Sequence, residues 1–238
     1  MAGRLILFPV PIAPEQFAAQ FSTYNTELLG GCHTFIVEEL RTARRFLKMA
    51  GYPHPIDNTQ FFVLNEHTQE IEIGHYLDPI AKGEDVGLLS EAGLPCVADP
   101  GAMITRIAQR QGIEVIPLVG PSSLMLALMA SGMNGQNFAF VGYLPVDRNE
   151  RVRAIKRLEE RVRHEHQTQI MIEAPYRNDQ LLQAMSECCS PETRICVACD
   201  ILSPSQSIKT RTAREWKSML SKKQVESLHK RPTVFLIG

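Results

Sequence analysis

Residues 90–101 are the stretch of this 238-residue chain whose composition best suits ligand binding. They read SEAGLPCVADPG, with two glycines, two prolines and two acidic residues, and they directly follow the apolar run 86–89. Glycine lets a ligand approach the backbone closely, and proline stiffens a loop. Ordinary connections between a strand and a helix take roughly 2–6 residues. The stretch therefore predicts a loop that binds the polar end of a nucleotide-like molecule, with a plain connector as the alternative.

Basic residues gather in a predicted helix at 149–165. Together with Arg148, which directly precedes this helix, they are Arg151, Arg153, Lys156, Arg157, Arg161 and Arg163. Such a cluster can neutralise RNA phosphates. Glutamates are interspersed among them, so an amphipathic surface helix is the alternative. The formal net charge of the chain is −1, so RNA binding would depend on this patch or on Arg41, which shares a helical face with Arg45.

The cysteine spacing does not favour a metal site. Cys196 and Cys199 form a C-x-x-C pair, and Cys188 and Cys189 precede them. Structural zinc sites use two closely spaced pairs held on turns. Cys196 and Cys199 instead belong to an apolar, strand-like run, whose alternation points them to opposite faces. We therefore expect buried free thiols and no bound metal.

Short apolar runs alternate with segments of helical spacing in the first half of the chain. The predicted strands cover 4–10, 34–37, 61–64, 85–89 and 114–118. The predicted helices cover 15–29, 39–50, 69–82 and 102–111, and a glycine follows each of them. This alternation predicts an α/β fold with a largely parallel sheet. In such sheets ligands bind in loops beyond the carboxyl ends of the strands.

A break in the pattern falls at the stretch Gly-Pro-Ser-Ser, residues 120–123. We expect an N-terminal α/β lobe at 1–119 and a C-terminal α/β lobe at 120–238. The second half has predicted helices at 124–131, 149–165, 176–188 and 213–220, and predicted strands at 138–144, 170–172, 194–199 and 233–237. Its strand order is expected to be more mixed than that of the first half.

The loop 90–101 resembles the SDAGTPxxSDPG signature of the bacterial small-subunit ribosomal RNA ribose 2′-O-methyltransferases. These enzymes belong to the tetrapyrrole methylase superfamily, the class III S-adenosylmethionine-dependent methyltransferases. Six further segments are similar to the family motifs AEDTR, LxEHN, PxPGPSA, ASGL, FxGFLP and EAPHR, and they lie at 37–41, 64–67, 117–123, 130–133, 140–145 and 173–177. The resemblance spans nearly the whole chain.

The resemblance implies two α/β lobes with S-adenosylmethionine in the cleft between them, and usually a homodimer. Carried over motif by motif, the cofactor-binding residues are Ile12, Ala92, Gly93, Leu94, Val97, Ser122, Ser123 and Glu173. The candidate RNA-contacting residues are Arg41, Arg148, Arg151 and Arg177.

The sequence departs from the family pattern in four places. Residues 11–14 read PIAP where the family carries PIGN, so one glycine is missing. Glu91 and Leu94 replace an aspartate and a threonine, and Leu94 cannot form a hydrogen bond. Thr68 replaces the asparagine after the Glu-His pair. We also expect the small helical extension of the ribosomal RNA enzymes to be absent after Gly238.

Methyl transfer from a sulfonium is an in-line displacement, so such an enzyme mainly aligns the donor and the acceptor. A ribose hydroxyl is a poor nucleophile and gains from a general base. The candidate bases are His67, Glu39 and Glu66, with Glu91 and Glu173 as further possibilities. The unperturbed pKa of histidine, ~6.5, suits His67 best, and a hydrogen-bonded structural histidine is the alternative.

We therefore expect an S-adenosylmethionine-dependent methyltransferase that acts on a ribose in small-subunit ribosomal RNA. Two alternatives remain open. The acceptor could instead be a tetrapyrrole, a corrin or another small molecule. The protein could also be a non-catalytic relative that has lost cofactor binding, which residues 11–14 and Leu94 would favour. The sequence shows no signal-peptide pattern and no long apolar run, so we expect a cytoplasmic protein.

Overall fold

The computed structural model describes residues 2–65, 68 and 72–238, which fall into two compact units. The first unit runs up to Ser122, and the second runs from Ser123 to Gly238. None of the helices formed by these described residues is long and apolar enough to span a bilayer.

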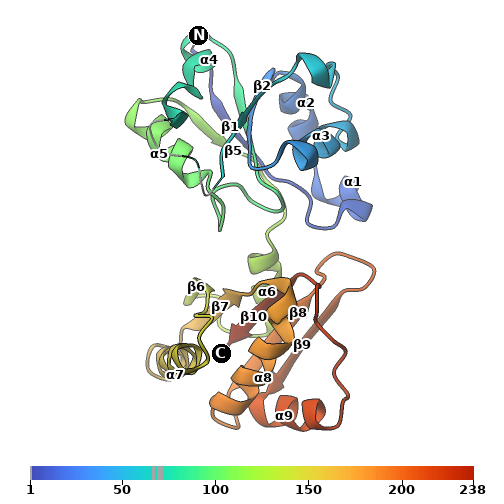
Figure 1. Cartoon of the computed structure of the whole chain (residues 1–238), viewed down its shortest axis with the longest axis vertical. Coiled ribbons are helices and arrows are strands. Elements are labelled where there is room, and N and C mark those ends of the chain that lie inside the picture. Colours follow the sequence, from blue (N-terminus) through green and yellow to red (C-terminus); the bar gives the residue numbers. More distant parts are fainter. Residues whose placement is uncertain (1, 66–67, 69–71) are drawn as a thin grey trace. The chain divides into compact units, whose positions relative to one another are not determined.

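The first unit is built on a five-stranded sheet in which all neighbouring strands are parallel. The strand order is β3-β2-β4-β1-β5 (Figure 1). The strands are β1 (Leu5–Phe8), β2 (Thr34–Val37), β3 (Gln60–Val63), β4 (Val86–Leu89) and β5 (Val115–Pro117), and η2 (Ile56–Asn58) precedes β3. Every residue of β1, β2 and β4 is buried, as expected where helices cover both faces of a parallel sheet.

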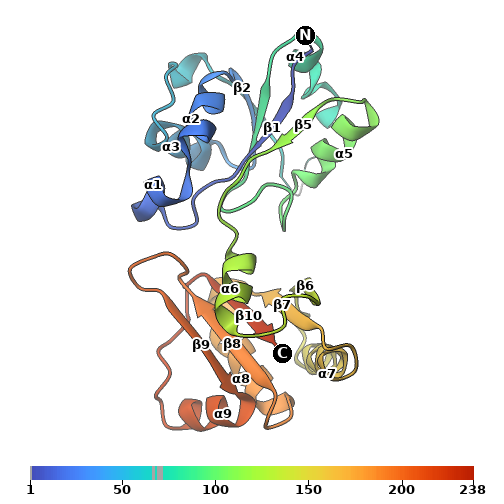
Figure 2. The same cartoon turned by 180° about the vertical axis from the view of Figure 1, so that it is seen from behind.

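Alternate residues of the central strands face two separate hydrophobic cores. Ile6 and Phe8 pack with the helices on one face, which are α1 (Phe17–Gln20), α2 (Thr23–Gly30) and α3 (Leu40–Met49). Leu5 and Leu7 pack with those on the other face, which are η3 (Glu72–His75), α4 (Asp78–Ala81) and α5 (Ala102–Arg110). Figure 2 shows α5 and the α2–α3 pair on opposite sides of the sheet. The two-residue period of side chains along a strand produces this division.

β1 and β4 are neighbours whose outgoing connections run to opposite edges of the sheet. From β1 the chain passes through η1 (Pro14–Gln16), α1 and α2 to β2, whereas from β4 it passes through α5 to β5 on the far side of β1. In open α/β sheets, ligands bind beyond the carboxyl ends of strands at such a point. The loops 9–16 and 90–101 start from these two carboxyl ends, so the fold brings the predicted binding loop to the expected place.

The second unit holds a mixed five-stranded sheet of order β6-β7-β10-β8-β9. The strands are β6 (Phe138–Tyr143), β7 (Thr168–Ile172), β8 (Arg194–Cys199), β9 (Ser207–Thr212) and β10 (Thr233–Ile237). β6 and β7 pair in parallel, and the other neighbours pair antiparallel. The carboxyl ends of β6 and β7 therefore lie at the same edge of the sheet.

Helices cover both faces of this second sheet. On one face lie α7 (Arg148–Glu165), α8 (Asn178–Cys188) and α9 (Ala213–Ser221), with Leu158, Met185 and Trp216 in a shared core. η4 (Pro175–Arg177) leads into α8. On the other face lies α6 (Ser123–Ser131), as Figures 1 and 2 show together. The hydroxyl of Thr210 donates to the Ser131 carbonyl at 2.8 Å and joins α6 to β9.

Two predicted helices differ from those in the structure, and one strand was not predicted. The helix predicted over 15–29 is η1, α1 and α2, because Ser22 is extended and its Oγ caps α2 by accepting from the Asn25 N–H at 3.1 Å. Of the helix predicted over 69–82, residues 69–71 lie outside the described residues and the rest forms η3 and α4. β9 was not predicted, because Ile208 is its only large apolar residue and it lies at the edge of the sheet.

Candidate functional site

Gly93 joins the loop that follows β4 to the loop that follows β1. Its N–H donates to the Val10 carbonyl at 2.7 Å, and its carbonyl accepts from the Val10 N–H at 2.9 Å. The Ser90 hydroxyl also donates to the Gly93 carbonyl, at 2.8 Å. A β-carbon on Gly93 would lie 3.6 Å from Ile12 Cγ2 and from Pro121 O, and φ at this residue is +81°. Loops from β1, β4 and β5 therefore converge on a backbone position that favours glycine.

The buried side chain of Gln20 holds the first of these loops, residues 11–14. Its Oε1 accepts from the N–H groups of Ile12 and Ala13 at 2.9 and 3.3 Å, and its Nε2 donates to the Ala13 carbonyl at 2.6 Å. Ala13 stands where the resembled family carries glycine. Its φ is −130°, which any residue adopts readily. The missing glycine therefore causes no backbone strain in this loop.

Glu91 ties the loop 90–101 to the start of α3. Its Oε1 accepts from the Thr42 hydroxyl at 2.7 Å. Glu39 caps the same helix, because its Oε2 accepts from the N–H groups of Arg41 and Thr42 at 2.9 and 3.2 Å. Negative charge is favourable at the N-terminus of a helix, where the dipole is positive. Two of the candidate general bases thus form hydrogen bonds that hold the loop and the helix together.

Asp99 shapes the second half of the loop. Its Oδ1 accepts from the Gly101 N–H at 2.7 Å and from the Cys96 N–H at 3.2 Å. Cys96 and Ala98 have left-handed φ angles of 68° and 56°, a conformation that costs roughly 1–2 kcal/mol for a residue with a β-carbon. Burial raises the pKa of the Asp99 carboxyl, and the two backbone hydrogen bonds oppose that rise only in part. The half-buried carboxyl of Asp99 therefore stabilises a strained turn.

Apolar side chains in these loops remain exposed. Val97 is 43% exposed and Val119 is 88% exposed, and Ile12 and Leu94 are half-buried. The Asn25 Nδ2 donates to the Val119 carbonyl at 3.0 Å, so the backbone of Val119 is held in place although its side chain faces outward. Covering such surface with an apolar ligand group is favourable.

In the second unit, the buried Glu173 and the half-buried Arg177 form an ion pair directly after β7. Glu173 Oε1 accepts from the Arg177 Nε at 3.0 Å, from its Nη2 at 2.6 Å and from the Ala174 N–H at 2.8 Å. The hydrogen bond and the charge of Glu173 raise the pKa of the Arg177 guanidinium. The side chain of Glu173 is 1% exposed, and its buried Oε2 has no hydrogen-bond partner among the described residues. Buried polar atoms are normally paired, so this oxygen is suited to accept a hydrogen bond from a ligand.

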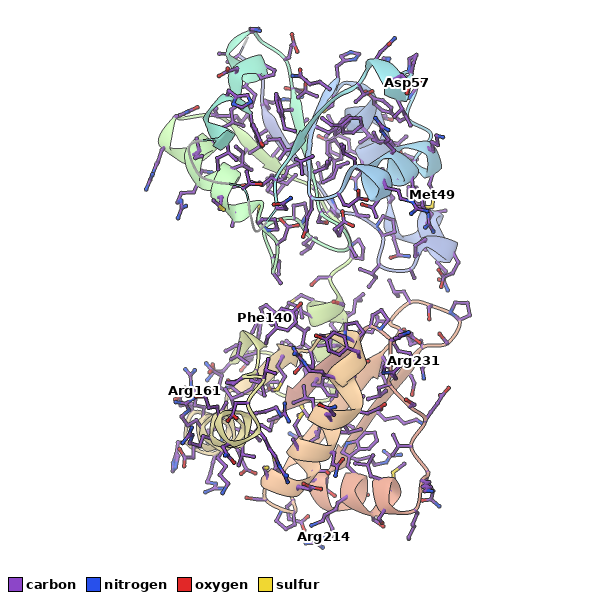
Figure 3. The ribbon with its side chains drawn as sticks, in the orientation of Figure 1. Met49, Asp57, Phe140, Arg161, Arg214 and Arg231 are labelled. Atoms are coloured by element: carbon purple, nitrogen blue, oxygen red, sulfur yellow. The ribbon has the colours of Figure 1, made fainter. Side chains whose placement is uncertain are left out.

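The predicted RNA-contacting arginines differ in what they can offer. Arg41 and Arg148 are exposed in the first turns of α3 and α7. Arg151 is buried, and its Nη1 donates to the Val146 carbonyl at 3.1 Å, so its guanidinium binds backbone of its own unit. Arg177 is held by Glu173. The exposed basic residues of α7 are Arg148, Arg153, Lys156, Arg157, Arg161 and Arg163, and Figure 3 shows Arg161 projecting away from the sheet.

Some predicted site residues carry little or no structural description. His67 and Glu66 lie outside the described residues. Ser122 and Ser123 are half-buried at the start of α6, and Ala92 is exposed beside Gly93. Gln20 and Thr42 were not among the predicted residues. Their partners are 7, 8 and 49 positions away along the chain, separations that a local pattern does not reveal.

The cysteines of the second unit do not gather into a ligand set. Cys196 pairs in register with Thr210 across the ladder, and Cys199 lies in the core that α7, α8 and α9 cover. Burial raises the pKa of both thiols. Across the described part of the chain, no group of three or more histidine, cysteine or acidic side chains is placed to hold a metal ion.

Comparison with known proteins relates these features to one family. The family profile described as tetrapyrrole (corrin/porphyrin) methylases matches residues 27–216. The ribosomal RNA small subunit methyltransferase I of Pseudomonas aeruginosa is 30% identical over 212 residues, which cover 88% of this chain and 70% of that relative.

Two solved structures share the fold. The methyltransferase CobJ superposes with a TM-score of 0.63 at 18% identity, over 100% of this chain and 94% of that one. The uroporphyrin-III C-methyl transferase from Thermus thermophilus, complexed with S-adenyl homocysteine, gives a TM-score of 0.57 at 16% identity, over 99% and 97% of the two chains. The predicted α/β fold of two lobes is thereby confirmed. The chain belongs to the tetrapyrrole methylase family, and the prediction of an S-adenosylmethionine-dependent methyltransferase is confirmed.

Proposed function

We propose that the loop 90–101 is central to the binding of S-adenosylmethionine, and the observation that carries this proposal is the position of Gly93. Backbone from three loops meets there, beyond the carboxyl ends of two adjacent strands. The proposed cofactor-binding residues are Ile12, Ala92, Gly93, Leu94, Val97 and Ser122 in the first unit and Ser123 and Glu173 in the second.

The chemistry of these residues suits the cofactor. The exposed side chains of Val97 and Val119 and the half-buried side chain of Leu94 match the adenine ring and the methionine carbons. The unpaired Oε2 of Glu173 matches an N–H of the amino or ammonium group. When bound, S-adenosylmethionine supplies a methyl group already activated by its sulfonium. The task of the protein residues is then to bind, orient and keep water away from the reacting atoms.

The proposed acceptor is a ribose 2′-hydroxyl in small-subunit ribosomal RNA. The relative from Pseudomonas aeruginosa carries that substrate class in its name. The surface of α7 adds a second argument, since six exposed basic side chains outnumber the exposed Glu150, Glu160 and Glu165. A surface with excess positive charge attracts phosphates in a salt-dependent way.

Transfer of the methyl group to an oxygen requires the acceptor hydroxyl to give up its proton. The carboxylate of Glu39 caps the start of α3, and that of Glu91 accepts from Thr42, so both are engaged in holding the fold. We therefore keep His67 and Glu66 as the preferred candidates for the base, with His67 first because of the unperturbed pKa of histidine, ~6.5.

The family resemblance also supports a homodimer acting in the cytoplasm, and exposed Met129 and Phe138 of the second unit offer apolar surface for an interface.

A second candidate acceptor is a tetrapyrrole or another small molecule. The family description and the neighbour from Thermus thermophilus favour it, because their names refer to corrin, porphyrin or uroporphyrin methylation. The excess of basic side chains on α7 favours RNA over this alternative.

Two measurements test the proposal. Calorimetric titration with S-adenosylmethionine and S-adenosylhomocysteine is expected to give saturable binding to one site per chain. Labelled methyl from S-adenosylmethionine is then expected to appear on the RNA of isolated small ribosomal subunits, and nuclease digestion will show a 2′-O-methylated nucleoside. No binding up to millimolar ligand, or label on a porphyrinoid and none on RNA, would contradict the proposal.

A further inference from the structure

Two exposed tyrosines lie at the edge of the second sheet where β6 and β7 end. Tyr143 is the last residue of β6, and Tyr176 lies in η4, directly after β7. Each residue is 61% exposed, which leaves much of its surface available to a ligand. β6 and β7 are parallel neighbours, with Tyr143 in register with Ile172. The topology therefore brings both rings to the same edge.

The backbone of β6 is distorted immediately before Tyr143. The pairing of β6 with β7 shifts register between Phe140 and Tyr143. Gly142 within this irregularity has φ +71°, and a β-carbon there would meet no atom within 4 Å. The glycine is thus required by conformation and not by crowding. Bulges of this kind redirect a side chain and are frequent next to functional sites.

A cation of fixed position lies with the two rings. The Arg177 Cζ is 5.3 Å from the centroid of the Tyr176 ring, a distance at which a guanidinium interacts with an aromatic face. Tyr176 and Tyr143 also contribute to the raised pKa of the Arg177 guanidinium, after the hydrogen bond and the charge of Glu173. The two hydrogen bonds from Arg177 to Glu173 prevent its guanidinium from moving freely. The exposed Arg148 lies five residues after Tyr143, at the start of α7.

We propose that Tyr143, Tyr176 and Arg177 form a platform on which an unpaired base of an RNA acceptor stacks. The proposal rests on the proposed RNA methyltransferase function and names the residues that recognise the acceptor. Proteins that bind single-stranded RNA place bases on tyrosine rings and guanidinium planes, and every base offers a face for such stacking. A duplex offers none, because its bases are already stacked. The platform thus selects unpaired nucleotides.

The test compares RNA binding by alanine variants with that of the wild-type protein. The probes are a fluorescein-labelled single-stranded RNA of mixed sequence and a blunt duplex of the same length. Tyr143→Ala and Tyr176→Ala are each expected to weaken binding of the single strand roughly 5- to 100-fold and to leave duplex binding unchanged. Tyr143→Phe and Tyr176→Phe keep the ring and are expected to bind like the wild type. Tyr24→Ala, which removes a 57% exposed tyrosine of the first unit, serves as the matched control.

Three results would overturn the platform. One is unchanged single-strand binding in both alanine variants. Another is an equal loss in the phenylalanine variants. The third is a loss of binding that accompanies dissociation of a dimer in sedimentation, because the rings would then belong to a subunit interface. Wild-type protein that methylates small subunits while the alanine variants bind normally would refute only the platform. Wild-type protein that binds S-adenosylmethionine but no RNA would refute the RNA function together with it.

Discussion

One carboxylate oxygen of Glu173 accepts two N–H groups from Arg177, and its other oxygen is buried without a partner in the part of the chain that the structure describes. This arrangement neutralises a carboxylate that is almost fully removed from water, and it keeps one acceptor available. A buried carboxylate that loses its counter-charge strongly destabilises the folded state. The pair therefore links the stability of the second unit to its capacity to bind a ligand.

Replacing Arg177 with leucine is expected to lower the free energy of unfolding by roughly 3 kcal/mol, because Glu173 would remain buried without its counter-charge. The double variant Arg177→Leu/Glu173→Gln is expected to recover a large part of this loss, since glutamine carries no charge. Urea denaturation followed by circular dichroism measures both effects. A single variant as stable as the wild type would show that the pair is not stabilising.

Gly93→Ala is expected to weaken S-adenosylmethionine binding at least about tenfold, because the strained residue would shift the loops that meet there. The added strain is also expected to lower the free energy of unfolding by about 1–2 kcal/mol. Gly112→Ala is the matched control: its φ is +68° and a β-carbon there meets no atom within 4 Å. It is expected to lose similar stability and to keep normal affinity in calorimetry. Equal affinities in both variants would argue against Gly93 as a site residue.

Asp99→Asn is expected to keep the turn 96–101, because an amide oxygen can accept the same two N–H groups. Asp99→Ala leaves both N–H groups unpaired and is expected to cost about 1–3 kcal/mol. Burial raises the folded-state pKa of Asp99 above its unfolded value. The folded state therefore binds the proton more tightly, and the resulting gain in the free energy of unfolding is fully present at low pH. It is lost as pH rises from about 4, the unfolded value, through the folded pKa.

Asparagine does not titrate, so the stability of Asp99→Asn relative to the wild type is expected to improve as pH rises across that window. Denaturant midpoints measured between about pH 3.5 and pH 7 for the two proteins provide the comparison. A relative stability of Asp99→Asn that falls with rising pH would contradict the raised pKa.

Arg153→Gln/Arg157→Gln is expected to weaken RNA binding and to lower the magnitude of the slope of log affinity against log salt concentration by about 2, one unit for each phosphate that is no longer neutralised. The control is Lys217→Gln/Lys222→Gln, which removes the same charge from exposed positions in and after α9. Filter binding at several salt concentrations gives both slopes. Equal slopes for the two double variants would mean that the charge of α7 does not meet RNA.

Local pattern determined much of this protein. The alternation of apolar runs with helical segments predicted the parallel sheet of the first unit, because burial on both faces makes β1, β2 and β4 continuously apolar. The glycines, prolines and acids of 90–101 predicted a binding loop. The same kind of reasoning missed β9, since an exposed edge strand leaves little hydrophobic signal. It also merged α1 and α2, where Ser22 interrupts the helical backbone.

The order and composition of the segments determined the fold class and predicted a binding loop at 90–101, and the motif resemblance indicated the family, because these properties depend on neighbouring residues. Tertiary structure decided which loops meet. Val10 and Gly93 pair only because β1 and β4 are adjacent in the sheet. Arg151 is buried while Arg153 is exposed. Glu173 keeps one oxygen free because Arg177 occupies the other. Such relationships depend on strand order and on packing between distant segments, which a local pattern does not encode.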